Sequence, residues 1–202
     1  MVKRNSNSSN KKHQLKMLGK EIFKFFFSNF FGALLGGAAL CLGTYASRVC
    51  EFPILAPLLF AVGIVIVMVF DLGLITRFTP THSYSLKNIL AGLIILASNV
   101  LVASLLGQLS SLTVNPPENL FLWSILGGIV IGLVSLNNMM HTPYKVALAL
   151  LLMYIFVMIK LPHCVVYAFY NVDFPTLLTV IAGNIVGGVG LNIAIRLHAI
   201  TK

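Results

Sequence analysis

Two ionisable side chains and a proline interrupt one of the most apolar stretches of the chain, "MIKLPHCVVYAF" at 158–169. Lys160 and His163 can carry charge, and Pro162 removes a backbone N–H and disrupts the helix at its own position. Histidine has an unperturbed pKa of about 6.5, so it can exchange protons at ordinary pH. A broken helix with a titratable histidine is therefore the best functional candidate, ahead of a packed histidine or a simple proline kink.

The composition places these residues in a membrane. Of 202 residues 58% are hydrophobic and 9% are charged, and the mean hydropathy is +0.94. Soluble domains contain about 25% charged residues, so we expect an all-α, multi-pass membrane protein. Six apolar windows reach the roughly 20 residues that a membrane-spanning helix needs. They are 25–47, 53–76, 87–109, 119–140, 145–170 and 174–196.

Basic residues predict the orientation. Twelve lysines and arginines fall on one side of the six windows, and only Arg48 is clearly exposed on the other. The twelve are Lys3, Arg4, Lys11, Lys12, Lys16, Lys20, Lys24, Arg77, Lys87, Lys145, Arg196 and Lys202. This bias predicts that the 1–24 tail and the 198–202 terminus are cytoplasmic. Interleaved Ser and Asn predict a disordered tail, attracted to anionic lipid rather than to nucleic acid.

Two pairs of motifs indicate a three-span unit used twice, over about 25–110 and 119–197. "LASNVLVASLLG" (96–107) matches "IAGNIVGGVGL" (181–191), and Asn99 aligns with Asn184 after Gly183. "LLGGAAL" (34–40) matches "ILGGIVI" (125–131). An odd number of spans inverts the second copy, as in many transporters, although small-residue patterns also recur by chance in helical bundles. Spans two and five are then equivalent.

Charge at membrane depth marks these two equivalent spans. Span two contains Asp71, and span five contains Lys160 and His163; an ion pair between Asp71 and Lys160 is one purely structural use. Enzyme chemistry is not expected, since the spans hold a single carboxylate and the nearest histidines, His141 and His198, lie at the cytoplasmic ends. We therefore expect no catalytic residue, no metal and no cofactor.

Several motifs resemble those of the formate/nitrite transporter family of pentameric weak-acid anion channels, over nearly all of 25–197. "GNIVGG" (183–188) stands as in the family, and "GIVIVMVFDLGLIT" (63–76) follows the family pattern without a gap. His163 matches the central histidine, and Phe156 precedes it by seven residues as in the family. The chain is identified as a divergent member, with six spans in an aquaporin-like arrangement of two inverted repeats, and with spans two and five broken.

The resemblance implies roles for individual residues. One constriction is formed by Phe60, Phe156 and Val134, and the other by Ile64, Leu74 and Ile75. His163 occupies the chamber between them beside Thr76. Apart from the resemblance, the positive charge of Lys160 is expected to help to draw the anion in. The implied protein is a homopentamer in the bacterial plasma membrane. It conducts formate, nitrite, hydrosulfide or a similar anion, linked to a proton; the alternative is a pore for a neutral solute such as hydrogen sulfide.

Five departures from the family pattern remove or add polar groups. The usual Glu before the histidine is Pro162, and the usual Asn four residues after it is Tyr167. The asparagine of the fourth span is replaced by Ile131, and the loop before that span contains no lysine. Lys160 stands where the family has glycine. A changed specificity is therefore expected first at Lys160 and Tyr167.

Overall fold

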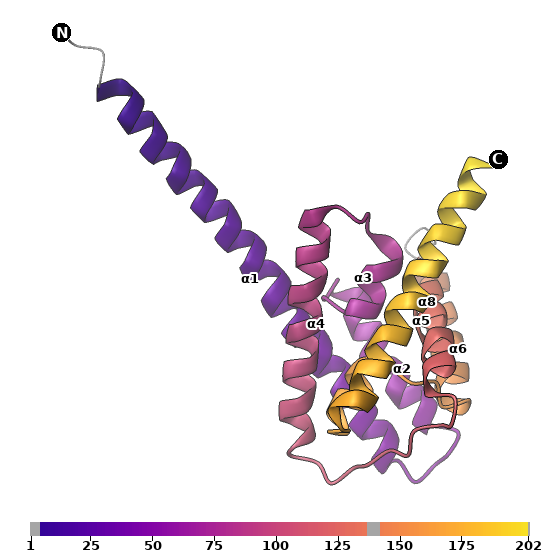
Figure 1. Cartoon of the computed structure of the whole chain (residues 1–202). Helices are drawn as coiled ribbons and strands as arrows, with labels where there is room; N and C mark the ends of the chain where they lie inside the picture. Colours follow the sequence, from indigo (N-terminus) through magenta and orange to yellow (C-terminus); the bar gives the residue numbers. More distant parts are fainter. Residues whose placement is uncertain (1–4, 137–141, 202) are drawn as a thin grey trace.

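The computed structural model describes residues 5–136 and 142–201, and these residues form eight helices (Figure 1). The first half contains α1 (Asn5–Val49), α2 (Ala56–Val69), α3 (Ile75–Thr81) and α4 (Leu86–Gly107). The second half contains α5 (Leu120–Leu136), α6 (Thr142–Met158), α7 (Cys164–Phe169) and α8 (Phe174–Ile200). Lys3, Arg4, His141 and Lys202, and the end of the predicted 119–140 span, lie outside the described residues.

Three of these helices are long and apolar enough to cross a membrane by themselves: Gly19–Val49 within α1, α4 and α8. Shorter apolar helices, which include α2, α5 and most of α6, complete the bundle. Both termini lie at the same end of the molecule (Figure 1), as six crossings require. The protein is therefore a multi-pass, all-α membrane protein.

The prediction of a disordered tail is wrong, because α1 begins at Asn5. Lys, Leu, Met, Gln and Glu, which are frequent between residues 11 and 24, all favour helix. The tail also extends a helix that already exists, so it avoids the unfavourable nucleation step.

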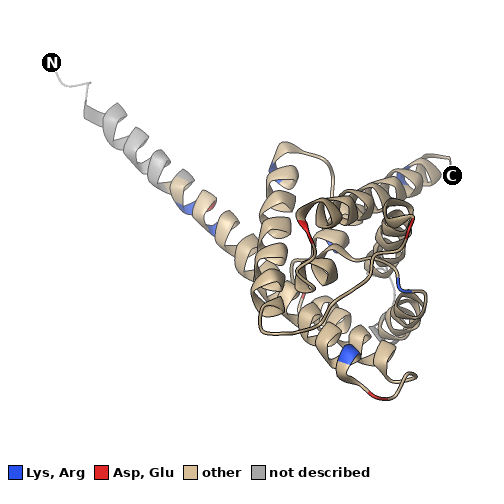
Figure 2. Cartoon of the chain, turned by 60° about the horizontal axis from the view of Figure 1, so that its bottom comes forward, with Lys and Arg blue, Asp and Glu red and all other residues tan. Residues whose placement is uncertain are grey.

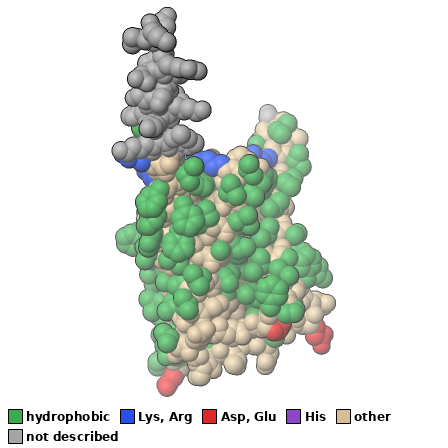
Figure 3. Space-filling view, turned by 60° about the vertical axis from the view of Figure 1, so that its left-hand side comes forward, with side chains coloured by type: hydrophobic (Ala, Val, Ile, Leu, Met, Phe, Trp, Pro, Cys, Tyr) green, Lys and Arg blue, Asp and Glu red, His purple; other side chains and the backbone are tan. Residues whose placement is uncertain are grey.

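On the face that Figure 3 shows, charged side chains gather at the two ends of the bundle. Figure 3 shows Lys and Arg where the tail leaves the body, acidic residues at the opposite end, and mostly apolar side chains between them. Viewed toward the end opposite the termini, the body of the bundle contains few charged residues (Figure 2). A broad apolar flank between two polar rims is the surface that a bilayer requires.

Spans two and five are both broken, as predicted. α2 and α6 end in the same backbone motif, in which Leu72 N–H donates to Val67 O (2.9 Å) and Leu161 N–H donates to Phe156 O (3.1 Å). The residue before each of these donors has a left-handed conformation that usually favours glycine: Asp71 at φ 50° and Lys160 at φ 56°. After the first break, α3 continues to Thr81, beyond the predicted limit at 76.

The first break is held by one buried amide from α4. Asn99 Nδ2 donates to Ala33 O (2.7 Å) and Gly73 O (3.1 Å), and its Oδ1 accepts from Ile75 N–H (3.0 Å). Asn99 thus ties α1, the break and the start of α3 together.

Asn184 of α8 makes the corresponding bonds in the second half. Its Nδ2 donates to Ser124 O (2.7 Å) and Pro162 O (3.0 Å), and its Oδ1 accepts from Cys164 N–H (2.8 Å). Each partner is the counterpart of one in the first half: a residue near the Gly-Gly pair, a residue of the break, and the first residue of the next short helix. This agreement confirms the two inverted three-span repeats.

Glycine at 127 is required by the close approach of α5 to the second break. A Cβ at Gly127 would lie 2.5 Å from Pro162 O, whereas a Cβ at Gly190 on α8 would meet nothing within 4 Å. We predict that Gly127→Ala destabilises the protein by about 1–3 kcal/mol through overpacking. Gly190→Ala, the matched control, should leave stability unchanged or raise it, because alanine favours helix. Thermal unfolding in detergent tests this, and equal midpoints for the two variants would contradict it.

Candidate functional site

His163 lies in the second break, completely buried, in extended backbone at φ −125° and ψ 129°. Its Nδ1 accepts a hydrogen bond from Val165 N–H (3.1 Å) and so caps the start of α7. A nitrogen that accepts from an N–H carries no proton, so the neutral ring holds its proton on Nε2. The cap therefore fixes both the orientation and the tautomer of the histidine.

Nε2 of His163 lies 3.1 Å from Oγ1 of Thr76, across 87 residues of sequence. Thr76 stands in the first turn of α3, just beyond the first break, and is also buried. The two broken spans thus meet at this pair. The sequence-based placement of Thr76 beside His163 agrees with this geometry.

One aromatic ring packs against the histidine, and a second ring stacks on the first. Phe60 of α2 and Phe156 of α6 are nearly parallel, with centroids 6.0 Å apart and planes inclined by 9°. The Phe156 ring also meets the His163 ring edge-on, with centroids 6.2 Å apart. Val134 of α5 is buried in the same core. An apolar lid of this kind keeps water from the imidazole.

The residues expected at the other constriction are also buried in this core. Ile64 belongs to α2, whereas Leu74 and Ile75 come directly before Thr76 at the start of α3. Leu74 caps α3 in extended backbone, at φ −135° and ψ 127°. It is thus the counterpart of His163 in the first repeat.

The expected ion pair between Asp71 and Lys160 is wrong. Asp71 Oδ1 instead lies 2.6 Å from Nη2 of Arg77, because the left-handed turn at Asp71 directs the chain back along the start of α3. Lys160 is exposed at the second break, and it makes no side-chain hydrogen bond or ion pair within the part of the chain that the structure describes.

Two residues near the site were missed by sequence reasoning, Arg77 and Asn192. Asn192 Nδ2 donates to Pro80 O (2.7 Å) and His82 O (3.2 Å), and so holds the end of α3 against α8. The available signal was a third asparagine in an apolar helix, two turns after Asn184. Arg77 had no such signal, because it stands in a polar segment.

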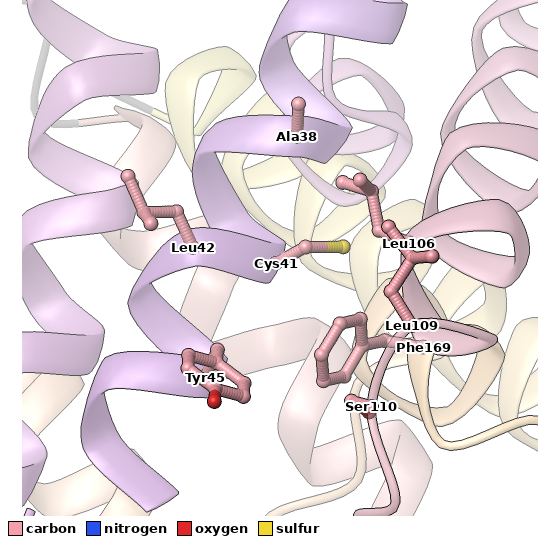
Figure 4. A pocket seen from close by; sticks show the side chains of 8 residues that line it. All are labelled: Ala38, Cys41, Leu42, Tyr45, Leu106, Leu109, Ser110 and Phe169. Carbon is pink, nitrogen blue, oxygen red and sulfur yellow. The ribbon is translucent and has the colours of Figure 1, made fainter. Parts of the chain in front are cut away.

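A recess of about 250 Å³ on the flank of the bundle is separate from these residues (Figure 4). It is lined by Ala38, Cys41, Leu42, Tyr45, Leu106, Leu109, Ser110 and Phe169. None of them is a candidate pore residue. Over the described residues there is also no group of three His, Cys, Asp or Glu side chains that could hold a metal ion.

Asn184 positions His163 through the peptide groups on either side of it. We predict that Asn184→Leu destabilises the protein by about 1–3 kcal/mol, because the carbonyl of Pro162 and the N–H of Cys164 lose a buried partner. Asn115→Leu, in an exposed loop, is the control for the same change of side chain. Thermal unfolding of both variants in detergent tests this prediction. An unfolding midpoint for Asn184→Leu equal to that of the wild type would refute the role assigned to this amide.

Comparison with known proteins identifies the fold. No protein-family model and no curated protein matches the chain. Among solved structures, the chain is similar to a pentameric formate channel with formate bound, at a TM-score of 0.65 and 16% sequence identity. The match covers 90% of this chain and 98% of the channel. The motif-based resemblance is therefore confirmed at the level of fold: the chain has the fold of a formate channel.

Proposed function

We propose that the protein is a channel for small monovalent anions of weak acids, such as formate, nitrite or hydrosulfide. In this proposal it is a homopentamer with one pore per protomer, and it lies in the plasma membrane of a bacterium with both termini in the cytoplasm. The fold of a pentameric formate channel supports the architecture. The basic residues at the terminal end of the bundle support the orientation.

The buried contact between Nε2 of His163 and Oγ1 of Thr76 is the single observation that carries this function, because the cap on Nδ1 assigns the ring proton to Nε2. Moving a bare anion past apolar walls costs several kcal/mol or more, whereas its conjugate acid crosses at a much lower cost. The Nε2–H bond points to Thr76 and is the donor that an anion entering the chamber would meet. The buried phenylalanine pair keeps that chamber free of competing water.

A proton can follow the anion through the same ring. When a second proton binds Nδ1, the ring becomes an imidazolium and the bond from Val165 N–H is lost. The imidazolium then transfers its Nε2 proton to the anion, which leaves as the neutral acid, and the ring is left neutral with its proton on Nδ1. Loss of that proton to solvent and uptake of another at Nε2 restore the starting tautomer and the bond from Val165 N–H. Thr76 offers a hydroxyl that either donates to the anion or accepts from Nε2. In this scheme the exposed ammonium of Lys160 attracts anions toward the second break.

A second candidate is a pore for neutral solutes, and one feature of the site favours it. Both partners of the His163 ring are uncharged, since they are the Thr76 hydroxyl and the Val165 backbone N–H. Uncharged partners stabilise a neutral ring and a neutral guest. Hydrogen sulfide or an undissociated acid would then cross without a proton being transferred.

We predict that His163→Asn and His163→Phe lower formate uptake into proteoliposomes by about 100-fold, the range that loss of an acid–base group usually causes, and abolish its pH dependence. His198→Asn, an exposed histidine at the end of α8, is the control and should transport normally. Wild-type uptake in both His163 variants would overturn the proposed mechanism.

Measurement of electrical current across the membrane distinguishes the anion channel from the pore for neutral solutes. Anions that cross without a compensating proton should give a current across a planar bilayer that reverses at the anion's equilibrium potential, whereas full proton transfer makes the flux electroneutral. A neutral pore should give uptake that follows the concentration of the undissociated form and ignores membrane potential. A measurable anion current therefore excludes the neutral pore.

A further inference from the structure

The two breaks share a backbone but differ in the side chains that surround it. Asp71 and Lys160 occupy equivalent left-handed positions, which favour glycine and, less strongly, asparagine and aspartate. Glycine would be the residue of choice if the backbone alone decided. A charged side chain at such a position can contribute an interaction that glycine cannot.

Only the first break has such an interaction among the described residues. Arg77 Nη2 lies 2.6 Å from Asp71 Oδ1, and Nη1 donates to Leu72 O (3.3 Å). The Arg77 side chain is only 15% exposed although Asp71 is 85% exposed, so the guanidinium lies against the break itself. In the second repeat Val166 stands where Arg77 would be, three residues after the residue that caps the short helix. The ion pair is therefore not a requirement of the shared architecture.

The segment between the two charges holds two of the three residues of one constriction, Leu74 and Ile75. Asp71 precedes Leu74 and Ile75, and Arg77 directly follows Thr76. The guanidinium thus closes a short loop: one end is the left-handed turn after α2, and the other is the first turn of α3. We propose that Asp71 and Arg77 are a positioning pair that sets the width of this constriction and so limits the size of the anion that passes. This inference rests on the proposed channel function.

The alternative is that Arg77 merely neutralises a carboxylate close to the hydrocarbon. The two readings differ for Asp71→Gly, which removes the charge and also relieves the left-handed backbone. Under the alternative, this variant is at least as stable as the wild type and keeps its selectivity. Under the positioning role, stability is likewise kept, but selectivity for small anions falls.

The experiment compares initial rates of formate and lactate uptake by the full-length protein in proteoliposomes, together with thermal unfolding. We expect Asp71→Gly and Arg77→Met each to lower the formate-to-lactate ratio by about tenfold, equivalent to about 1.4 kcal/mol of barrier. Asn171→Gly is the matched control, since Asn171 is also left-handed, at φ 48°, and belongs to neither break. Its ratio should equal that of the wild type.

Two results would overturn the positioning role, and a third would count against the proposed function. An unchanged ratio in Asp71→Gly and Arg77→Met overturns the positioning role, whatever happens to the unfolding temperature. A ratio that falls equally in Asn171→Gly also overturns it, because the effect is then not specific to the ion pair. Absence of formate uptake in the wild type counts instead against the proposed function, so the two failures are distinguishable.

Discussion

The rest of the structure depends on two amide side chains that satisfy broken backbone at membrane depth. A spanning helix that stops in hydrocarbon exposes N–H and C=O groups that find no water there, and each unsatisfied group costs several kcal/mol. Asn99 and Asn184 each bond one carbonyl of a break, one N–H beyond it, and one carbonyl of a neighbouring helix. Extended residues are thereby possible in the centre of the bundle, where the site is built.

The inverted repeat places two extended residues in equivalent positions and gives them different chemistry. Leu74 and His163 have nearly the same backbone angles, and each caps a short helix that completes its span. Leucine supplies only an apolar wall, whereas histidine supplies a cap acceptor on one nitrogen and a proton on the other. The histidine thus supplies a polar group at the position where the equivalent residue of the first break is apolar.

The helix break at Pro162 and the repeat were predictable from the sequence, because they depend on short residue motifs. The partner of Asp71 was not, because it depends on the direction that the chain takes after the break. Pro162 predicted the break in span five, and the paired Gly-Asn and Ser-Asn motifs predicted the repeat, since few residue types suit those positions; the break in span two was expected from the family resemblance. The partner of Asp71 was not predictable, because Lys160 and Arg77 were both available cations and only the left-handed turn decides between them. Helix in the tail was missed because disorder was judged from polarity, without regard to the helix that the tail extends.

The contacts of His163 explain how this chain manages without the polar residues that the family resemblance leads one to expect around the histidine. A glutamate before the histidine is expected from the resemblance, and Pro162 can supply neither its charge nor a backbone N–H. In this chain the Pro162 carbonyl is bound by Asn184, and the imidazole is oriented by Val165 N–H instead of by an acidic side chain. Among the described residues the imidazole therefore has only uncharged hydrogen-bonding partners. In the channel proposed above, the proton would be supplied by the solution together with the anion, and not by a neighbouring carboxyl group.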